Sequence, residues 1–334
     1  MFRLIKLQKA LGAFAAGVFT IMALPAFAQS VHIKIGTSNP SSSHYGLAVA
    51  YAESVAKGTN DGIIVDVLQT GGSIDNIKLL IREEVSFGIA AGGAQYFAYS
   101  GTGSFEGAAY PKLRAMFVYN TTPVIMAVRA DSGITSVYDL EGQPFNAGLA
   151  GSSTERETRS AFEALGITPK YYSASLDDAI NAMKDNRIVG FTKSAASLVN
   201  PDASVLDVSS LLDIRVLPLP EPDKVLAHDP TLMIATIPAH VYADQGQTEE
   251  MKVFGHTSGY ATSTNVDADL IYRAFKAIME NKDMQTAVFK SVGDNHYPTL
   301  TAQLASIPIH AGVVRYLREA GIAIPDRLVP PEAN

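Results

Sequence analysis

Short apolar runs alternate along the chain with longer segments whose apolar residues recur every three or four positions. The short runs predict strands, and the periodic segments predict amphipathic helices. Regular alternation of the two is typical of βαβ units with a mainly parallel sheet. The predicted strands are 31–37, 63–69, 86–91, 113–119, 123–129, 144–149, 171–175, 187–192, 214–219 and 231–237, and the predicted helices are 44–57, 73–84, 94–99, 154–165, 176–185, 266–289 and 310–321.

Two apolar segments are placed to connect separate parts of the chain. Residues 113–133 contain two apolar runs joined by the sequence YNTT, where the chain can pass from one lobe to another. Residues 231–240 are the candidate for the return. We therefore expect two α/β lobes with a hinged cleft between them. Lobe 1 would comprise residues 29–120 and 238–334, and lobe 2 would comprise residues 121–237.

The first 28 residues have the layout of a secretory signal. Three basic residues precede an almost wholly apolar stretch at 10–24, and residues 26–28 form an A-x-A cleavage site. Cleavage after Ala28 would place the rest of the chain in the periplasm. An uncleaved membrane anchor is the alternative, although the apolar stretch is short for a helix that spans a bilayer.

The charge and the absence of cysteine narrow the function further. The 334-residue chain has a formal net charge of −7 at pH 7, and removing residues 1–28, which carry three basic and no acidic side chains, makes it −10. This charge argues against binding to nucleic acid or to anionic lipid. Without cysteine, disulfides, thiol catalysis and cysteine-ligated metals are excluded.

Three turns rich in glycine, serine and threonine each connect a predicted strand to a predicted helix. They read SNPSSSHY at 38–45, QTGGSIDN at 69–76 and GLAGSSTERET at 148–158. The backbone N–H groups at a helix N-terminus lack partners within the helix, and together with the helix dipole they favour a negative charge. The turns therefore indicate a protein that captures a small anionic molecule.

Several motifs occur in an order that carries a family resemblance. They include TGGS followed by Asn76, RADSGITSVYDLEG, GLAGSSTE and the closing IPIHAGVVRYLREAGI. Over about residues 31–325 the chain resembles the TAXI family of receptors, which serve tripartite ATP-independent periplasmic (TRAP) transporters. The resemblance implies a type II periplasmic-binding-protein fold whose lobes close on a dicarboxylate or glutamate-like ligand. It also implies delivery of that ligand to a membrane permease.

The chain departs from the family pattern within the expected pocket. The first turn, usually Gly-rich and followed by Tyr-Tyr-Pro, reads NPSSSHYGLA and brings in His44. The third strand ends in IAAGGAQYF instead of a group like Gln-Ser-Asp, and a second-lobe turn reads FTKSAASLVNP, which brings in Lys193. The resemblance therefore implies the architecture but does not identify the ligand.

Candidate ligand-binding residues lie in the three turns and at neighbouring strand ends. Hydroxyls and amides of the turns would bind a carboxylate, and Lys193 would neutralise it when the lobes close. Each turn also has a purely structural interpretation as a capped helix start, and Lys193 has one as a surface lysine. The candidates are Ser42, Ser43, His44, Tyr45, Thr70, Gly71, Gly72, Ser73, Asn76, Gln95, Tyr119, Asn120, Gly151, Ser152, Ser153, Thr154 and Lys193.

The sequence contains none of the common catalytic motifs. G-x-S-x-G, H-E-x-x-H and the P-loop pattern are absent, and the seven histidines include no i, i+4 pair suited to a metal. We therefore expect no catalytic residue, metal or cofactor, and no nucleic-acid partner. The expected function is a periplasmic receptor that delivers a small carboxylate to a TRAP permease. A receptor that signals to a membrane sensor is the alternative, and an enzyme on the same fold is a more remote one.

Overall fold

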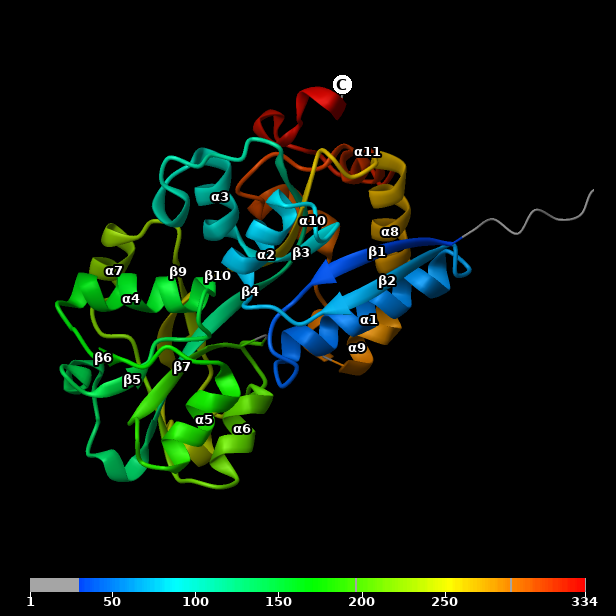
Figure 1. Ribbon diagram of the computed structural model, residues 1–334. Coiled ribbons are helices and arrows are strands. Elements are labelled where there is room, and N and C mark those ends of the chain that lie inside the picture. Colours follow the sequence, from blue (N-terminus) through cyan, green and yellow to red (C-terminus); the bar gives the residue numbers. More distant parts are fainter. Residues whose placement is uncertain (1–29, 196, 289, 334) are drawn as a thin grey trace, which may run out of the picture.

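The computed structural model describes residues 30–195, 197–288 and 290–333, so the expected signal segment and its cleavage site after Ala28 lie outside the described residues. Figure 1 shows two α/β lobes connected by the long strands β4 (Leu113–Arg129) and β10 (Met251–Ser263). Among the described residues, no helix has the length and apolar character that a membrane crossing requires.

Lobe 1 contains a parallel three-stranded sheet covered by helices. Its strands lie in the order β2 (Ile63–Leu68), β1 (Val31–Gly36) and β3 (Phe87–Ala91). The polar turns at 38–45 and 69–76 follow β1 and β2, so both lie at the carboxyl edge of this sheet. The helices of lobe 1 are α1 (Ser43–Gly58), α2 (Ser73–Ile81), α3 (Gly92–Ser100), α8 (Ala268–Glu280), α9 (Lys282–Val288), α10 (Tyr297–Leu304) and α11 (Ala311–Glu319).

Lobe 2 contains five shorter strands. The strands β7 (Gly190–Ser194), β5 (Pro144–Asn146) and β6 (Lys170–Tyr171) pair in parallel. The strand β8 (Ile214–Leu217) pairs with β4, and β9 (Met233–Ile237) pairs with β10. The helices of lobe 2 are α4 (Ser153–Leu165), α5 (Leu176–Lys184), α6 (Ala203–Ser209) and α7 (Pro222–His228).

Both passages between the lobes run along long antiparallel strands. The first half of β4 pairs with β10 in lobe 1, and its second half pairs with β7 and β8 in lobe 2. The predicted runs 113–119 and 123–129 are therefore one continuous strand. The return, expected at 231–240, is made instead by β10, since residues on either side of 240 pack in the core of lobe 2. Lobe 2 consequently extends past residue 237 to the beginning of β10.

The strand β10 has an unusual composition for a central strand, which explains why its sequence did not reveal it. It contains two glycines, Gly255 and Gly259, among small polar residues. A Cβ atom at Gly259 would lie 2.3 Å from the carbonyl oxygen of Phe117, and one at Gly255 would lie 2.5 Å from that of Thr122. The close approach of β4 therefore requires glycine where a strand pattern would place a β-branched residue.

Most of the helices predicted from the sequence are present in the structure, but some of their boundaries differ and three further helices occur among the described residues. The single helix expected at 266–289 is two helices, α8 and α9, separated at Asn281. The short helices α6 and α7 and the helix α10 were not predicted, because seven or eight residues give too little periodicity to recognise. The helices α1, α2, α4 and α5, which border the cleft, begin within one residue of their predicted starts.

Candidate ligand-binding site

A cavity lies where the two lobes meet, at the ends of α1, α2 and α4. Its volume is about 60 Å³, enough for several water molecules or for part of a small organic molecule. Nine of its lining residues carry a hydroxyl, one is lysine and two are histidine. The lining residues are Ser38, Asn39, Ser42, His44, Gly72, Ser73, Ile89, Ala91, Leu149, Ser152, Ser153, Thr154, Leu176, Thr192, Lys193, Ser194, His256 and Ser258.

The helices α1 and α2 of lobe 1 and α4 of lobe 2 begin at this cavity with polar residues. Ser42 caps α1, Gly72 precedes α2 without a side-chain cap, and Ser152 caps α4. Gly72 has φ 94°, a conformation that favours glycine, and a Cβ there would lie 3.3 Å from the Cβ of Ser152. The N-termini of α2 and α4 therefore face each other across the cleft, where their dipoles favour an anion between them.

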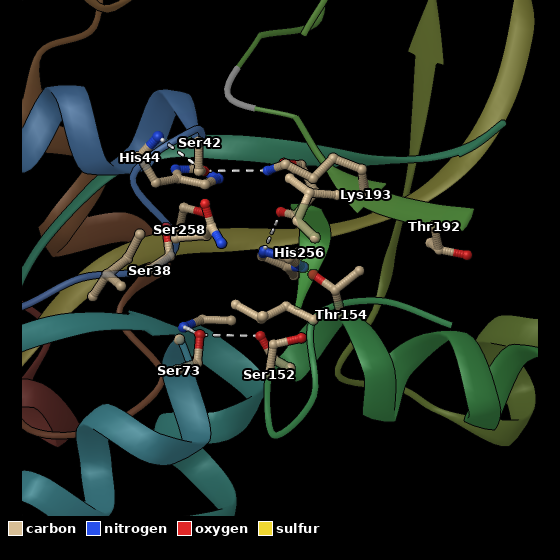
Figure 2. A pocket seen from close by; sticks show the side chains of 18 residues that line it. Ser38, Ser42, His44, Ser73, Ser152, Thr154, Thr192, Lys193, His256 and Ser258 are labelled. Atoms are coloured by element: carbon tan, nitrogen blue, oxygen red, sulfur yellow. Dashed lines mark hydrogen bonds between the residues drawn. The ribbon is translucent and has the colours of Figure 1, made fainter. Parts of the chain in front are cut away.

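One side of the cavity is formed by Ser42, His44 and Lys193 (Figure 2). The Lys193 ammonium, on β7 of lobe 2, donates to the Ser42 hydroxyl of lobe 1 over 3.3 Å and to the Ser194 carbonyl over 2.6 Å. The side chain is nearly buried, with 10% of its surface exposed. An ammonium has three N–H donors, so these two bonds leave one for a ligand oxygen.

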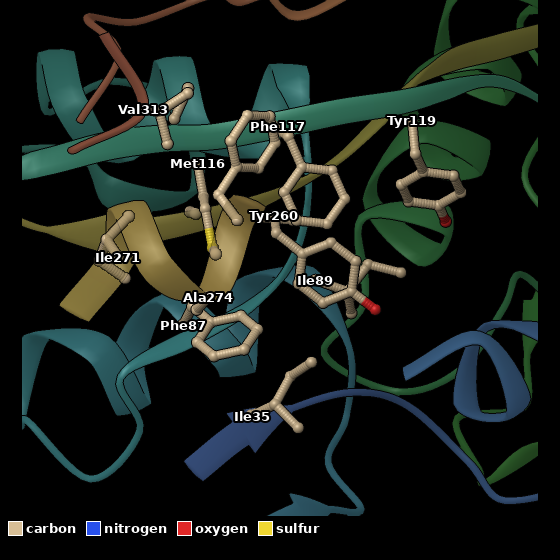
Figure 3. Packing of buried hydrophobic residues seen from close by; sticks show 14 of the residues in the cluster. Ile35, Phe87, Ile89, Met116, Phe117, Tyr119, Tyr260, Ile271, Ala274 and Val313 are labelled. Atoms are coloured by element: carbon tan, nitrogen blue, oxygen red, sulfur yellow. The ribbon is translucent and has the colours of Figure 1, made fainter. Parts of the chain in front are cut away.

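His44 is held as a neutral imidazole on this side. Burial lowers the pKa of His44 well below its usual range, and nearby Lys193 and His256 lower it further, against a backbone hydrogen bond with Ser194. Burial raises the pKa of Tyr119, so its hydroxyl keeps its proton and donates to His44 Nδ1 over 2.8 Å. Figure 3 shows Tyr119 beside Phe117 in the packed core of lobe 1, which fixes this donor.

The opposite side of the cavity is formed by serines at the starts of α2 and α4 (Figure 2). Ser153 of lobe 2 donates to the hydroxyl of Ser73 in lobe 1 over 3.0 Å, and the backbone N–H of Ala91 donates to the same oxygen. Ser152 accepts from the Glu155 backbone N–H, so its hydroxyl serves mainly as a helix cap. The hydrogen bond between Ser153 and Ser73 thus connects the two lobes inside the cavity.

No aspartate or glutamate is among the described residues that line the cavity. The nearest buried carboxylates have partners behind the lining. Glu157 contacts His256, and Asp202 accepts from Ser204 and lies 4.0 Å from the Lys193 ammonium. The cavity therefore presents a ligand with the positive charge of Lys193 and with neutral hydrogen-bond donors. The negative charges of Glu157 and Asp202 lie behind the lining residues.

The cleft is closed at its mouth by polar contacts between the lobes. Asp177, at the start of α5 in lobe 2, accepts hydrogen bonds from Asn39 over 3.3 Å and from Ser41 over 3.0 Å. Both donors belong to the first turn of lobe 1. Together with the Ser153–Ser73 and Lys193–Ser42 bonds, these contacts place the structure in a closed arrangement of the lobes.

The structure gathers part of the predicted residue set at the cavity and places the rest around it. Asn76 donates to two lobe 1 carbonyls, Gln95 to the Ala90 carbonyl, and Thr70 to the Thr37 carbonyl, so these three organise the turns. Asn120 accepts from Asn295. The predicted residues at the cavity are Ser42, His44, Gly72, Ser73, Ser152, Ser153, Thr154 and Lys193, and those beside it are Ser43, Tyr45, Thr70, Gly71, Asn76, Gln95, Tyr119, Asn120 and Gly151.

Several lining residues were not predicted from the sequence. Ser38 and Asn39 belong to a turn that was recognised, and they were omitted because they precede the helix start. His256 and Ser258 lie on β10, which lacks the pattern of a strand, so nothing in the sequence placed them near the other residues. Ser194 follows Lys193 directly and could have been found by extending the same strand end.

Solved structures of low sequence identity have the same architecture. A protein described as a periplasmic transporter is 13% identical, with 88% of this chain and 93% of that chain covered and a TM-score of 0.53. The zinc-bound ligand-binding component of an ABC-type import system from Staphylococcus aureus is 11% identical, with 91% and 98% covered and a TM-score of 0.51. At this identity the similarity establishes the fold, which is of the type II periplasmic-binding-protein kind.

A family match covers most of the chain. Residues 35–321 match the NMT1-like family, a range that includes all three polar turns and the main elements of both lobes. The TAXI assignment suggested by the motifs is finer than this match and stays a prediction. The chain belongs to the NMT1-like family.

Proposed function

We propose that the protein is a periplasmic solute receptor that captures a small carboxylate between its lobes and delivers it to a TRAP-type membrane permease. The observation that carries this proposal is the meeting of the N-termini of α1, α2 and α4 with the Lys193 ammonium at one cavity that has no carboxylate among its described lining residues. Such a site favours an anion. The permease type rests on the resemblance of the motifs to the TAXI receptors.

The charge of the lining supports a choice among carboxylates. An amino acid brings an ammonium group, which in a buried site needs a carboxylate or several acceptors. Asp202 and Glu157 lie behind Lys193 and His256 and are engaged there. A dicarboxylate, hydroxy acid or keto acid is therefore favoured over an amino acid such as glutamate.

A second candidate function follows from one hydrogen-bonded chain. His256 Nε2 lies 3.4 Å from the Ser194 hydroxyl, and His256 Nδ1 lies 2.6 Å from Glu157. Hydroxyl, imidazole and carboxylate in this order form the arrangement of an activated nucleophile. Recovery of bound ligand separates the two functions, because a receptor returns its ligand unchanged whereas a hydrolase returns products.

Thermal unfolding of ligand-free protein against matched compounds tests the proposal. Succinate, L-malate and 2-oxoglutarate should stabilise the protein, L-glutamate should do so less than 2-oxoglutarate, and the neutral succinamide should have no effect. A ligand present at 100 times its Kd adds about 2.7 kcal/mol to the free energy of unfolding, which shifts the midpoint clearly. Stabilisation by succinamide or by the cation putrescine, with none by any carboxylate, would refute the proposed ligand class.

A further inference from the structure

His256 occupies a central position at the cavity. It lies on β10 where this strand passes between the lobes, opposite Thr122 of β4. Its side chain is 4% exposed and lines the cavity between the Lys193 side and the Ser73 side (Figure 2). A ligand that touches both sides would therefore lie against this imidazole.

The carboxylate of Glu157 determines which nitrogen of His256 carries a fixed proton. Glu157 belongs to α4, is completely buried, and lies 2.6 Å from His256 Nδ1. Its other oxygen has no hydrogen bond among the described residues and lies 3.5 Å from the Arg156 guanidinium. A buried carboxylate is costly without a donor, so the proton belongs on Nδ1 in both the neutral and the charged imidazole.

The other ring nitrogen, Nε2, is consequently the atom that changes with protonation. It lies 3.4 Å from the Ser194 hydroxyl. In the neutral imidazole Nε2 only accepts a hydrogen bond, whereas in the imidazolium it donates one. An ionised carboxylate of a ligand only accepts, so it can bond to Nε2 only after a proton has been taken up.

Titratable groups from four elements surround His256. Glu157 on α4 favours the imidazolium, and Lys193 on β7 opposes it. His44 on α1 is kept neutral by burial and by the charges beside it, as its lowered pKa indicates. Arg156 is shared between Glu157 and Asp229, which follows α7. An anion bound beside the imidazole adds a negative charge, which favours the protonated form of His256.

We propose that His256 is a specificity-determining residue of the cavity and takes up a proton as an anionic ligand binds, with Glu157 as the residue that positions it. The inference rests on the proposed function. It predicts that the site accepts a carboxylate together with a proton. In the pH range where the ligand stays fully ionised, the affinity should therefore fall as the pH rises.

Calorimetric titration with 2-oxoglutarate, in buffers of different ionisation enthalpy, measures this proton uptake. At pH 7 to 8 the ligand is fully ionised, so uptake reports the protein. The protein should take up a net fraction of one proton, and its affinity should fall by up to about tenfold for each unit of rising pH. The variant His256→Asn should take up none, and its affinity should vary little with pH.

The variants are chosen to separate a structural role from the proposed one. The amide of His256→Asn can still donate to Glu157, and His256→Gln is a second non-titrating variant should the first fold poorly. Thermal unfolding without ligand reports the folding of each. Glu157→Gln should reduce the proton uptake, whereas His44→Asn should retain it, because His44 stays neutral.

Each outcome decides between the two proposals. Binding of 2-oxoglutarate without proton uptake, or uptake that persists in both His256 variants, would overturn the role of His256 and leave the receptor function standing. Failure of 2-oxoglutarate, succinate and L-malate all to bind would overturn the carboxylate function, and the role of His256 with it. Uptake that is lost in both variants supports the inference.

Discussion

Lys193 has an environment that would suit the binding of an anionic ligand. Its ammonium is nearly buried, donates to one oxygen from each lobe, and lies 4.0 Å from a buried carboxylate oxygen of Asp202. That separation is too long for a hydrogen bond, so Asp202 compensates the charge without occupying the third donor. Burying a charge in this way is costly, and a ligand carboxylate would complete its hydrogen bonding.

Replacing Lys193 tests this residue directly. Lys193→Met keeps the apolar stem and removes the charge, so carboxylate binding should weaken by about 1.5–3 kcal/mol, which is roughly tenfold or more. Calorimetric titration with 2-oxoglutarate measures the change. Lys170→Met, at an exposed lysine of the same lobe, is the matched control and should bind as the original protein does. Equal affinity in both variants would show that Lys193 does not contact the ligand.

At the scale of elements, the site depends on helix starts that are held in place by closely packed strands. The turns leading into α1, α2 and α4 position their N-termini, while β4 and β10 pass between the lobes beneath them. The contact of these two strands requires Gly255 and Gly259, since a Cβ at either would meet backbone atoms of β4. Backbone cannot move aside as the end of a flexible side chain can.

A substitution in β10 should therefore reduce stability. Gly259→Ala places a methyl group against the Phe117 carbonyl, and the free energy of unfolding should fall by about 1–3 kcal/mol. Denaturant unfolding of the ligand-free protein gives this value. Lys252→Ala, at an exposed position of the same strand, should change it by less than about 0.5 kcal/mol. A Gly259→Ala variant as stable as the original would contradict the close approach of the strands.

Some elements of the site could be predicted from the sequence and others could not. The turns at 38–45, 69–76 and 148–158 were recognisable because their polar residues follow apolar strands and precede periodic helices. His256 and Ser258 were not, because β10 replaces the strand pattern with glycine and small polar residues to meet β4. The local sequence pattern was therefore enough to locate the helix starts. The position of His256 and Ser258 at the cavity depends on the tertiary contact between β10 and β4, which no local pattern reveals.

At the scale of the whole molecule, the lobes meet through polar contacts at the mouth of the cleft and inside it. Asn39 and Ser41 contact Asp177 at the mouth, and Ser73 contacts Ser153 inside. Single hydrogen bonds of this kind, one exposed, one part-buried and one buried, each contribute only about 0.5–1.5 kcal/mol, so closure can be reversed. A ligand that binds both sides of the cavity adds interactions only in the closed state, and it therefore shifts the population towards closure.

The most direct measurement is a crystal structure of the protein grown with the carboxylate that stabilises it most. The account predicts ligand density in the cavity between the starts of α1, α2 and α4. One carboxylate should lie within hydrogen-bond distance of Lys193 Nζ, with another ligand oxygen near His256 Nε2. Density for the ligand at any other place, or an empty closed cavity in protein shown to bind it, would contradict the account.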